Sequence, residues 1–112
     1  MKESPVFTKT HDLLRWLAPA TRKFPREHRF GLGQHLLDTA FDLQRALTAA
    51  GLDRAHTAEH LIEADIALAM LRKQLLLCHE LGLLSAGQYR HASTLTDAVG
   101  KTLGGWRKGM GA

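Results

Sequence analysis

The pattern of apolar positions predicts helices throughout the chain, and segment 61–81 differs from the others because it is apolar on two sides. At about 100° per residue, its apolar residues fall on two stripes that face in different directions. The first stripe contains Leu61, Ala64, Leu68, Leu71, Leu75 and Cys78. The second contains Ile62, Ile66, Met70 and Leu77. A surface helix of a small monomer needs one apolar face, so we expect the second stripe to contact another copy of the chain or a different protein.

Three further segments have helical periodicity, and no segment alternates like a strand. We expect helices from about Thr8 to Arg22, with a kink or a loosened last turn at Pro19, and from Pro25 to about Ala50. The predicted third helix extends from 53 to 82 and the fourth begins at 85 and frays into the terminal GMGA. The predicted inward residues of the first helix are Leu13, Leu14, Leu17 and Ala20. Those of the second helix are Phe30, Leu36, Leu37, Ala40, Phe41, Leu43 and Leu47. Those of the fourth helix are Tyr89, Ala92, Leu95, Val99, Leu103 and Trp106.

Residues typical of helix ends separate these segments. Gly51 suits a left-handed cap, and Asp53 is placed to accept the free amides of the third helix. Ser85 and Gln88 have the spacing of a capping box. Because every connection is short, neighbouring helices are expected to pack antiparallel. We therefore predict an all-α fold, an antiparallel up-down-up-down four-helix bundle, with a single domain over residues 1–112.

Composition limits the functional classes only in part. The chain has 112 residues and a net charge of +4, a mild basic bias that suits a nucleic acid or an acidic protein surface. The lone cysteine, Cys78, excludes an intramolecular disulfide and fits the core. The first residues lack the apolar run of a signal peptide, and no stretch is long enough to span a membrane. We expect a cytoplasmic protein without a cofactor.

Basic residues form two groups that could follow a phosphate backbone. Arg22, Lys23, Arg26 and Arg29 surround the first predicted turn, against a single acid, Glu27. On the last helix Arg90, Lys101 and Lys108 share one side, and Arg107 lies beside them. Several cations at such spacings suit nucleic-acid binding, whereas the alternative is a solvated helix face.

Asp65, Arg72 and His79 recur every seven residues between the two apolar stripes. Asp65 and Arg72 are too far apart for a direct pair within one helix, so each of these two is expected to find its partner on another helix. For Arg72 two interpretations stay open. It forms a contact that fixes register between helices or subunits, or it lies in a basic groove at an oligomer interface.

Signals of catalysis or metal binding are weak. His56, His60 and Glu63 share one face with a spacing that can coordinate a transition metal, but exposed polar residues are expected there and we predict no metal site. Gly31 and Gly33 lie inside a predicted helix, so they do not form a phosphate loop, and Gly33 is expected to allow close helix packing. We expect a protein that is not an enzyme.

Four segments together carry a family resemblance. They are FPREHRFGLG at 24–33, ADIALAMLR at 64–72, LGLLSAGQY at 81–89 and VGKTLGGW at 99–106. In this order they resemble the accessory variability determinant proteins of diversity-generating retroelements, which are related to four-helix-bundle proteins of ribosomal RNA intervening sequences.

The resemblance implies a four-helix bundle that assembles into a homopentamer. It also implies a non-catalytic accessory protein that binds the retroelement's reverse transcriptase and nucleic acid, either template RNA or its cDNA, to support mutagenic retrohoming. Arg26, Arg29, Arg72 and Lys101 are the basic residues inside the matching segments. The alternative is an oligomeric structural or protein-interaction bundle that does not bind nucleic acid.

Overall fold

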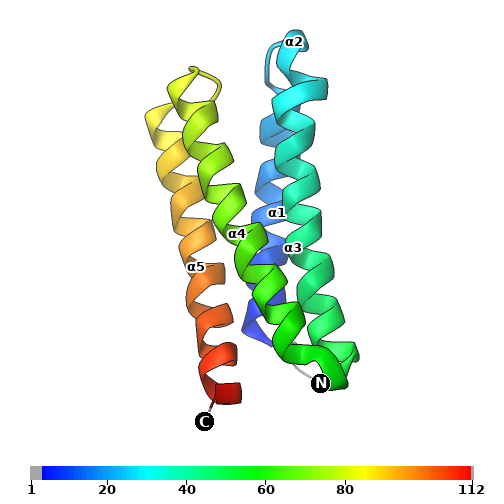
Figure 1. Ribbon diagram of the computed structural model, residues 1–112. Coiled ribbons are helices and arrows are strands. Elements are labelled where there is room, and N and C mark those ends of the chain that lie inside the picture. Colours follow the sequence, from blue (N-terminus) through cyan, green and yellow to red (C-terminus); the bar gives the residue numbers. More distant parts are fainter. Residues whose placement is uncertain (1–3, 112) are drawn as a thin grey trace.

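The computed structural model describes residues 4–111, which form a bundle of four long helices (Figure 1). The long helices are α1 (Pro5–Arg22), α3 (Gln34–Leu52), α4 (Thr57–Glu80) and α5 (Ala86–Gly111). Three short elements lie between them: α2 (Arg26–His28), the π-helix η1 (Arg29–Gly33) and the 3₁₀ turn η2 (Arg54–His56). The described residues contain no strand, and the predicted all-α four-helix fold is confirmed. No helix within residues 4–111 is long and apolar enough to cross a membrane.

Contacts between rings show how α1 and α5 are oriented. Phe7 near the start of α1 packs edge-on against Trp106 near the end of α5, with ring centroids 6.1 Å apart. Farther along α1, Trp16 lies 5.3 Å from His91 near the start of α5. The two helices therefore run in opposite directions. Figure 1 shows segments 22–33 and 81–86 at one end of the bundle, here called the tip, and the turn between α3 and α4 at the other end, here called the base.

The core is built from one apolar stripe of each long helix. All six residues of the first stripe of α4 are at most 3% exposed, which confirms their predicted burial. Burial of a leucine side chain contributes about 1.5 to 3 kcal/mol, so these stripes hold the bundle together. Burial also raises the pKa of the Cys78 thiol, as expected for a small apolar core residue. Other fully enclosed side chains include Leu13, Leu17, Leu36, Leu43, Leu47, Val99 and Leu103.

Asp65 and Arg72 of α4 have partners on another helix, as predicted; that helix is α5, and His79 contacts it as well. Asp65 forms an ion pair with Arg107. Arg72 Nη2 lies 3.3 Å from Asp97 Oδ1 and 3.4 Å from the carbonyl oxygen of Thr96. The ring of His79 stacks on Tyr89 with centroids 4.8 Å apart. From one contact to the next, the residue number increases along α4 and decreases along α5. The three contacts therefore agree on one register between the two helices.

Helix ends differ from the prediction at several positions. The first helix begins at Pro5 rather than Thr8, because proline suits a first helical turn, whereas its end at Arg22, beyond Pro19, is as predicted. The last helix does not fray at its glycines but extends to Gly111. Gly51 is not a left-handed cap, since it lies within α3. In residues 4–111 the left-handed position is Gly82, with φ of 78°.

The capping box that begins α5 is confirmed. The amide of Ser85 donates to Gln88 Oε1 over 2.8 Å, and the amide of Gln88 donates to Ser85 Oγ over 3.1 Å. Two amides that have no partner inside the helix are satisfied in this way. The start of α5 is therefore fixed by local chemistry next to the turn at Gly82.

Phe30 and Phe41 do not lie in the core, contrary to the prediction. The second predicted helix is interrupted by η1, and a π-turn holds an extra residue, so positions before Gln34 are rotated relative to α3. Phe30 is 84% exposed; eleven positions before Phe41, it would lie within about 20° of Phe41 on a regular helix, so the π-turn is not needed to keep it out of the core. Phe41 follows the buried Ala40 by one position, about 100° around the helix, and is half exposed.

Asp53 does not cap a helix with its side chain; it binds two histidines instead. Its Oδ2 lies 2.9 Å from His60 Nε2 and 3.0 Å from His56 Nδ1. The hydrogen bonds with His60 and His56 lower the pKa of Asp53 below 3.8, and the bond with Asp53 raises the pKa of His56 above 6.5. The ring nitrogens nearest Asp53 are thus already engaged with its carboxylate. Within residues 4–111 no group of three or more His, Cys, Asp or Glu side chains is arranged to hold a metal ion.

We predict that Asp53→Asn lowers the pKa of His56 toward 6.5. The folded-state pKa of Asp53 is lowered and that of His56 is raised, so their pairing stabilises the fold between these two values. That stabilisation is lost as the pH falls through the pKa of Asp53 or rises through the pKa of His56. NMR titration of the histidine ring protons measures the shift. A His56 pKa that is unchanged in the variant would contradict the pairing.

A second prediction concerns two glycines of α5. Alanine in place of glycine inside a helix stabilises it by about 1 kcal/mol. A Cβ at Gly104 would meet nothing within 4 Å, so Gly104→Ala should give this full gain. A Cβ at Gly100 would lie 2.8 Å from Arg72 Nη2, so the guanidinium must move. This movement weakens the ion pair between Arg72 and Asp97, which lies at the surface and contributes about 0.5 kcal/mol to stability.

Gly100→Ala should therefore stabilise the protein less than Gly104→Ala. Chemical denaturation of both variants and the parent measures the difference in the free energy of unfolding. Equal gains would mean that the Arg72–Asp97 pair contributes nothing to stability.

Candidate nucleic-acid interface and apolar face

The four predicted cations of the first turn lie together at the tip. Arg22 ends α1, Lys23 follows it, Arg26 begins α2 and Arg29 begins η1, and all four side chains are exposed. We call these four residues the basic turn. Its backbone is held by Pro25, whose carbonyl oxygen accepts hydrogen bonds from the amides of His28 (2.8 Å) and Arg29 (3.1 Å).

A buried phenylalanine fixes the basic turn to the bundle. Phe24 lies between Lys23 and Pro25 and is 3% exposed, so its ring is part of the core. Gly33, at the end of η1, packs against it. A Cβ at Gly33 would lie 3.4 Å from Phe24 Cδ2 and 3.3 Å from the carbonyl oxygen of His28. This close approach is the packing role predicted for Gly33, and it keeps the two sides of the turn together.

The charge of the protein is concentrated at this turn. Residues 22–33 contain four cations and one acid, Glu27, so their net charge is 4 − 1 = +3. The whole chain has a net charge of +4, which leaves +4 − 3 = +1 for all other residues. A mild overall charge therefore corresponds to a strongly positive patch at one end of the bundle, where it attracts anions most effectively.

The other predicted contact residues fall into different surroundings. Arg90 is exposed about one turn into α5, next to His91 and thus at the tip beside α1. Arg72 and Arg107 form ion pairs with Asp97 and Asp65, so part of their charge is neutralised within the chain. Lys101 and Lys108 are exposed farther along α5, toward the base. The structure thus brings the basic turn together and leaves the remaining cations spread along the bundle.

The second apolar stripe of α4 is exposed to solvent. Ile66 is 59% and Met70 46% exposed, and Ile62 and Leu77 are exposed to a similar extent. We call these four residues the apolar face. Ile66 and Met70 also line a groove of about 540 Å³ against α3, where Asp42 and Arg45 contribute charges. Contiguous exposed apolar residues with a polar border are typical of protein interfaces.

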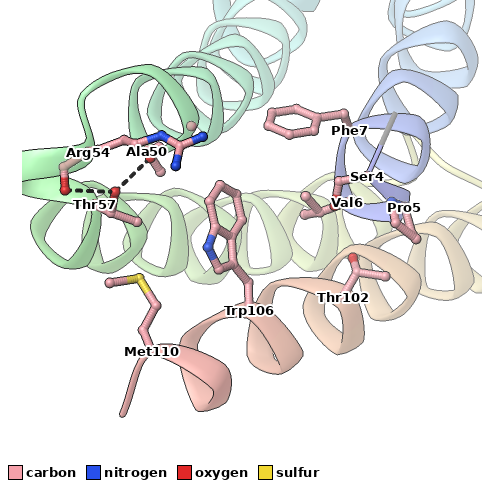
Figure 2. Close-up of a pocket in the computed structure, with 11 residues that line it drawn as sticks. Ser4, Pro5, Val6, Phe7, Ala50, Arg54, Thr57, Thr102, Trp106 and Met110 are labelled. Atoms are coloured by element: carbon pink, nitrogen blue, oxygen red, sulfur yellow. Dashed lines mark hydrogen bonds between the residues drawn. The ribbon is translucent and has the colours of Figure 1, made fainter. Parts of the chain in front are cut away.

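A separate hollow of about 760 Å³ lies at the base (Figure 2). Figure 2 shows the Trp106 indole between Phe7 and Met110, with the Arg54 guanidinium at one side. The hydroxyl of Thr57 also lines the hollow but donates to the carbonyl oxygen of Ala50 over 2.8 Å. The hollow is therefore mainly apolar, and it lies at the opposite end of the molecule from the basic turn.

One exposed aromatic residue at the tip was assigned to the core from the sequence. Phe30 follows Arg29 directly and lies four residues after Arg26. The signal in the sequence is FGLG, in which Gly31 and Gly33 follow the ring and permit an irregular helix. Uniform helical periodicity does not detect that signal.

Comparison with known proteins identifies a family. The family model described as bAvd-like matches residues 6–110, nearly the whole chain, and this range includes all four segments that carried the resemblance. No curated protein matches the chain. The matched range contains most of the bundle, the basic turn and the apolar face. The chain therefore belongs to the bAvd-like family, the proteins that resemble the accessory variability determinant.

Proposed function

We propose that this protein is a non-catalytic accessory subunit that binds the reverse transcriptase and the nucleic acid of a diversity-generating retroelement. Family membership supports the accessory role. The observation that carries nucleic-acid binding is the basic turn, in which residues 22–33 hold +3 of the net charge of +4. In this proposal the cations contact phosphates of the template RNA or its cDNA and keep the strand near the polymerase.

The arrangement of the tip suits this role. Phosphate contacts hold a strand in place without reading its sequence, which fits an accessory subunit that acts on a long template. The turn is anchored by the buried Phe24, so its cations are carried by a fixed backbone rather than by a disordered tail. Arg90 is a further exposed cation at the same end of the bundle, near the start of α5.

Self-association through the apolar face would strengthen the binding of nucleic acid, because the phosphate contacts of a single copy are weak. Four phosphate contacts on one single strand correspond to a salt slope of only about −3. Several copies in one assembly present several basic turns, and linked sites bind far more tightly than separate ones. We propose that Ile62, Ile66, Met70 and Leu77 form the contact between copies in a homo-oligomer, with five copies as the family resemblance implies.

A second candidate function is an oligomeric protein-interaction bundle that does not bind nucleic acid. The ion pairs of Arg72 and Arg107 favour it, since they use cations for internal structure. The salt dependence of RNA binding separates the two functions. Phosphate contacts give affinity that falls steeply with salt, whereas an interaction bundle would show no such binding.

We predict that reversing the basic turn with Arg22→Glu, Lys23→Glu, Arg26→Glu and Arg29→Glu abolishes RNA binding. Each substitution removes one phosphate contact and adds a charge that repels the strand. Helicity and oligomer mass should stay as in the parent, because all four side chains are exposed. Fluorescence anisotropy with a labelled single-stranded RNA, measured over a range of salt concentrations, tests this.

The matched control reverses four exposed cations elsewhere, Lys9, Arg15, Arg54 and Lys73. Both variants change the net charge from +4 by 4 × (−2), to −4, so overall charge cannot explain a difference between them. The control should retain most of the affinity. Equal loss in both variants would show that binding depends on total charge and not on the basic turn.

We predict that Ile66→Asp with Met70→Asp yields smaller oligomers of folded protein. Both side chains are exposed in the single chain, so a charge there opposes association without entering the core. Light scattering after size exclusion measures the mass, and circular dichroism measures helicity. The control, Leu68→Asp with Leu71→Asp on the buried stripe, should unfold the bundle. Unfolding of the Ile66/Met70 variant would place its stripe in the intrachain core.

A further inference from the structure

We infer that Phe30 is a stacking platform for an unpaired nucleobase, so that the tip prefers single-stranded nucleic acid. Of the large apolar side chains in the described chain, Phe30 is the most exposed, at 84%. Exposure of a whole phenyl ring costs free energy unless a partner covers it. This inference rests on the proposed nucleic-acid function and names the part of the nucleic acid that the tip contacts.

The charges around Phe30 identify the chemistry of its partner. Arg29 precedes the ring in the chain and Arg26 lies about one helical turn earlier, both exposed. Arginine and aromatic residues also occur together at protein interfaces, but the net charge of +3 on residues 22–33 favours an anionic partner. A nucleotide has a flat apolar base and an anionic phosphate, and it therefore fits an aromatic ring flanked by guanidinium groups.

The backbone holds the ring in a fixed outward position. Phe30 belongs to η1, whose far end packs against the end of α1 and the residues after it, because a Cβ at Gly33 would lie 3.4 Å from Phe24 and 3.6 Å from Thr21. A Cβ at Gly31 would meet nothing within 4 Å, so the outer side of this turn is open. π-turns are often found at functional sites, and in this one Phe30 has the most exposed apolar side chain.

Stacking on a side chain distinguishes single strands from duplexes. The bases of a duplex already stack on one another, so Phe30 can reach only unpaired bases, strand ends or loops. The phosphate contacts of the basic turn are available in both forms. We therefore expect Phe30 to add affinity for single strands alone, while the cations contribute to both.

Phe30→Ala tests this in the full-length protein. The probes are a labelled oligouridine RNA and an RNA duplex of equal length, with anisotropy recorded over a range of salt concentrations. Loss of one stacked base should weaken single-strand binding by about tenfold without changing the salt slope, and duplex binding should be unchanged. Phe30→Trp should restore single-strand affinity, because the indole also stacks.

The matched control is Leu52→Ala. Leu52 is almost as exposed as Phe30, at 81%, but lies at the base, so its removal should leave both affinities unchanged. Parent-like single-strand affinity in Phe30→Ala would overturn the inference, as would equal losses on single strand and duplex. If the variant binds RNA normally but loses binding to the reverse transcriptase of the same retroelement, the ring is a protein contact and the inference fails.

The basic-turn variant separates failure of this inference from failure of the proposed function. If the four charge reversals abolish RNA binding and Phe30→Ala changes nothing, the phosphate contacts stand and stacking is rejected. If neither set of substitutions affects RNA binding, the nucleic-acid role of the tip is rejected together with the stacking.

Discussion

The burial of one stripe of α4 is the constraint on which the other surfaces depend. Its six residues occupy the centre of the core, where four helices can exclude water from them. Once this stripe faces inward, the helical geometry leaves Ile66 and Met70 on the outside, since they lie on a different side of the same helix. The apolar face is thus a direct consequence of the packing that stabilises the chain. A helix that is apolar on two sides cannot bury both sides within a bundle of 112 residues.

Between the apolar stripes, polar residues orient α4 against α5. The contacts Asp65–Arg107, Arg72–Asp97 and His79–Tyr89 follow one another along the two helices and agree on a single register. The charged pairs are partly exposed, so each contributes little free energy. Their effect is specificity, because a shift by one turn would separate all of these partners. The same contacts explain why Arg72 and Arg107, which are paired with acids on the neighbouring helix, differ from the cations of the basic turn.

Much of this architecture could be predicted from the sequence because it depends on regular periodicity or on local chemistry. The buried stripe of α4, the partners of Asp65 and Arg72 on another helix, and the Ser85–Gln88 box are of this kind. The errors have two causes. Phe30 and Phe41 lie on one side of the second predicted helix, about 120° from its buried stripe, and an apolar residue type alone does not show that a side chain is buried. Asp53 has the residue type of a helix cap, but His56 and His60 compete for its carboxylate and bind it. A helix end is decided by three-dimensional neighbours as much as by residue type.

The charge distribution reconciles a mild net charge with a nucleic-acid role. Attraction between a protein and a phosphate chain depends on the cations within about a Debye length of the strand, roughly 8 Å at physiological salt, and not on the total. Residues 22–33 place +3 within one turn of the bundle, while the rest of the chain adds only +1. An even distribution of the same charge would give a weak field everywhere. Cations are concentrated at the tip, and Arg72 and Arg107 are paired with acids along the bundle. In the proposed function this distribution would direct a phosphate chain to one end and leave the apolar face of α4 for association with protein.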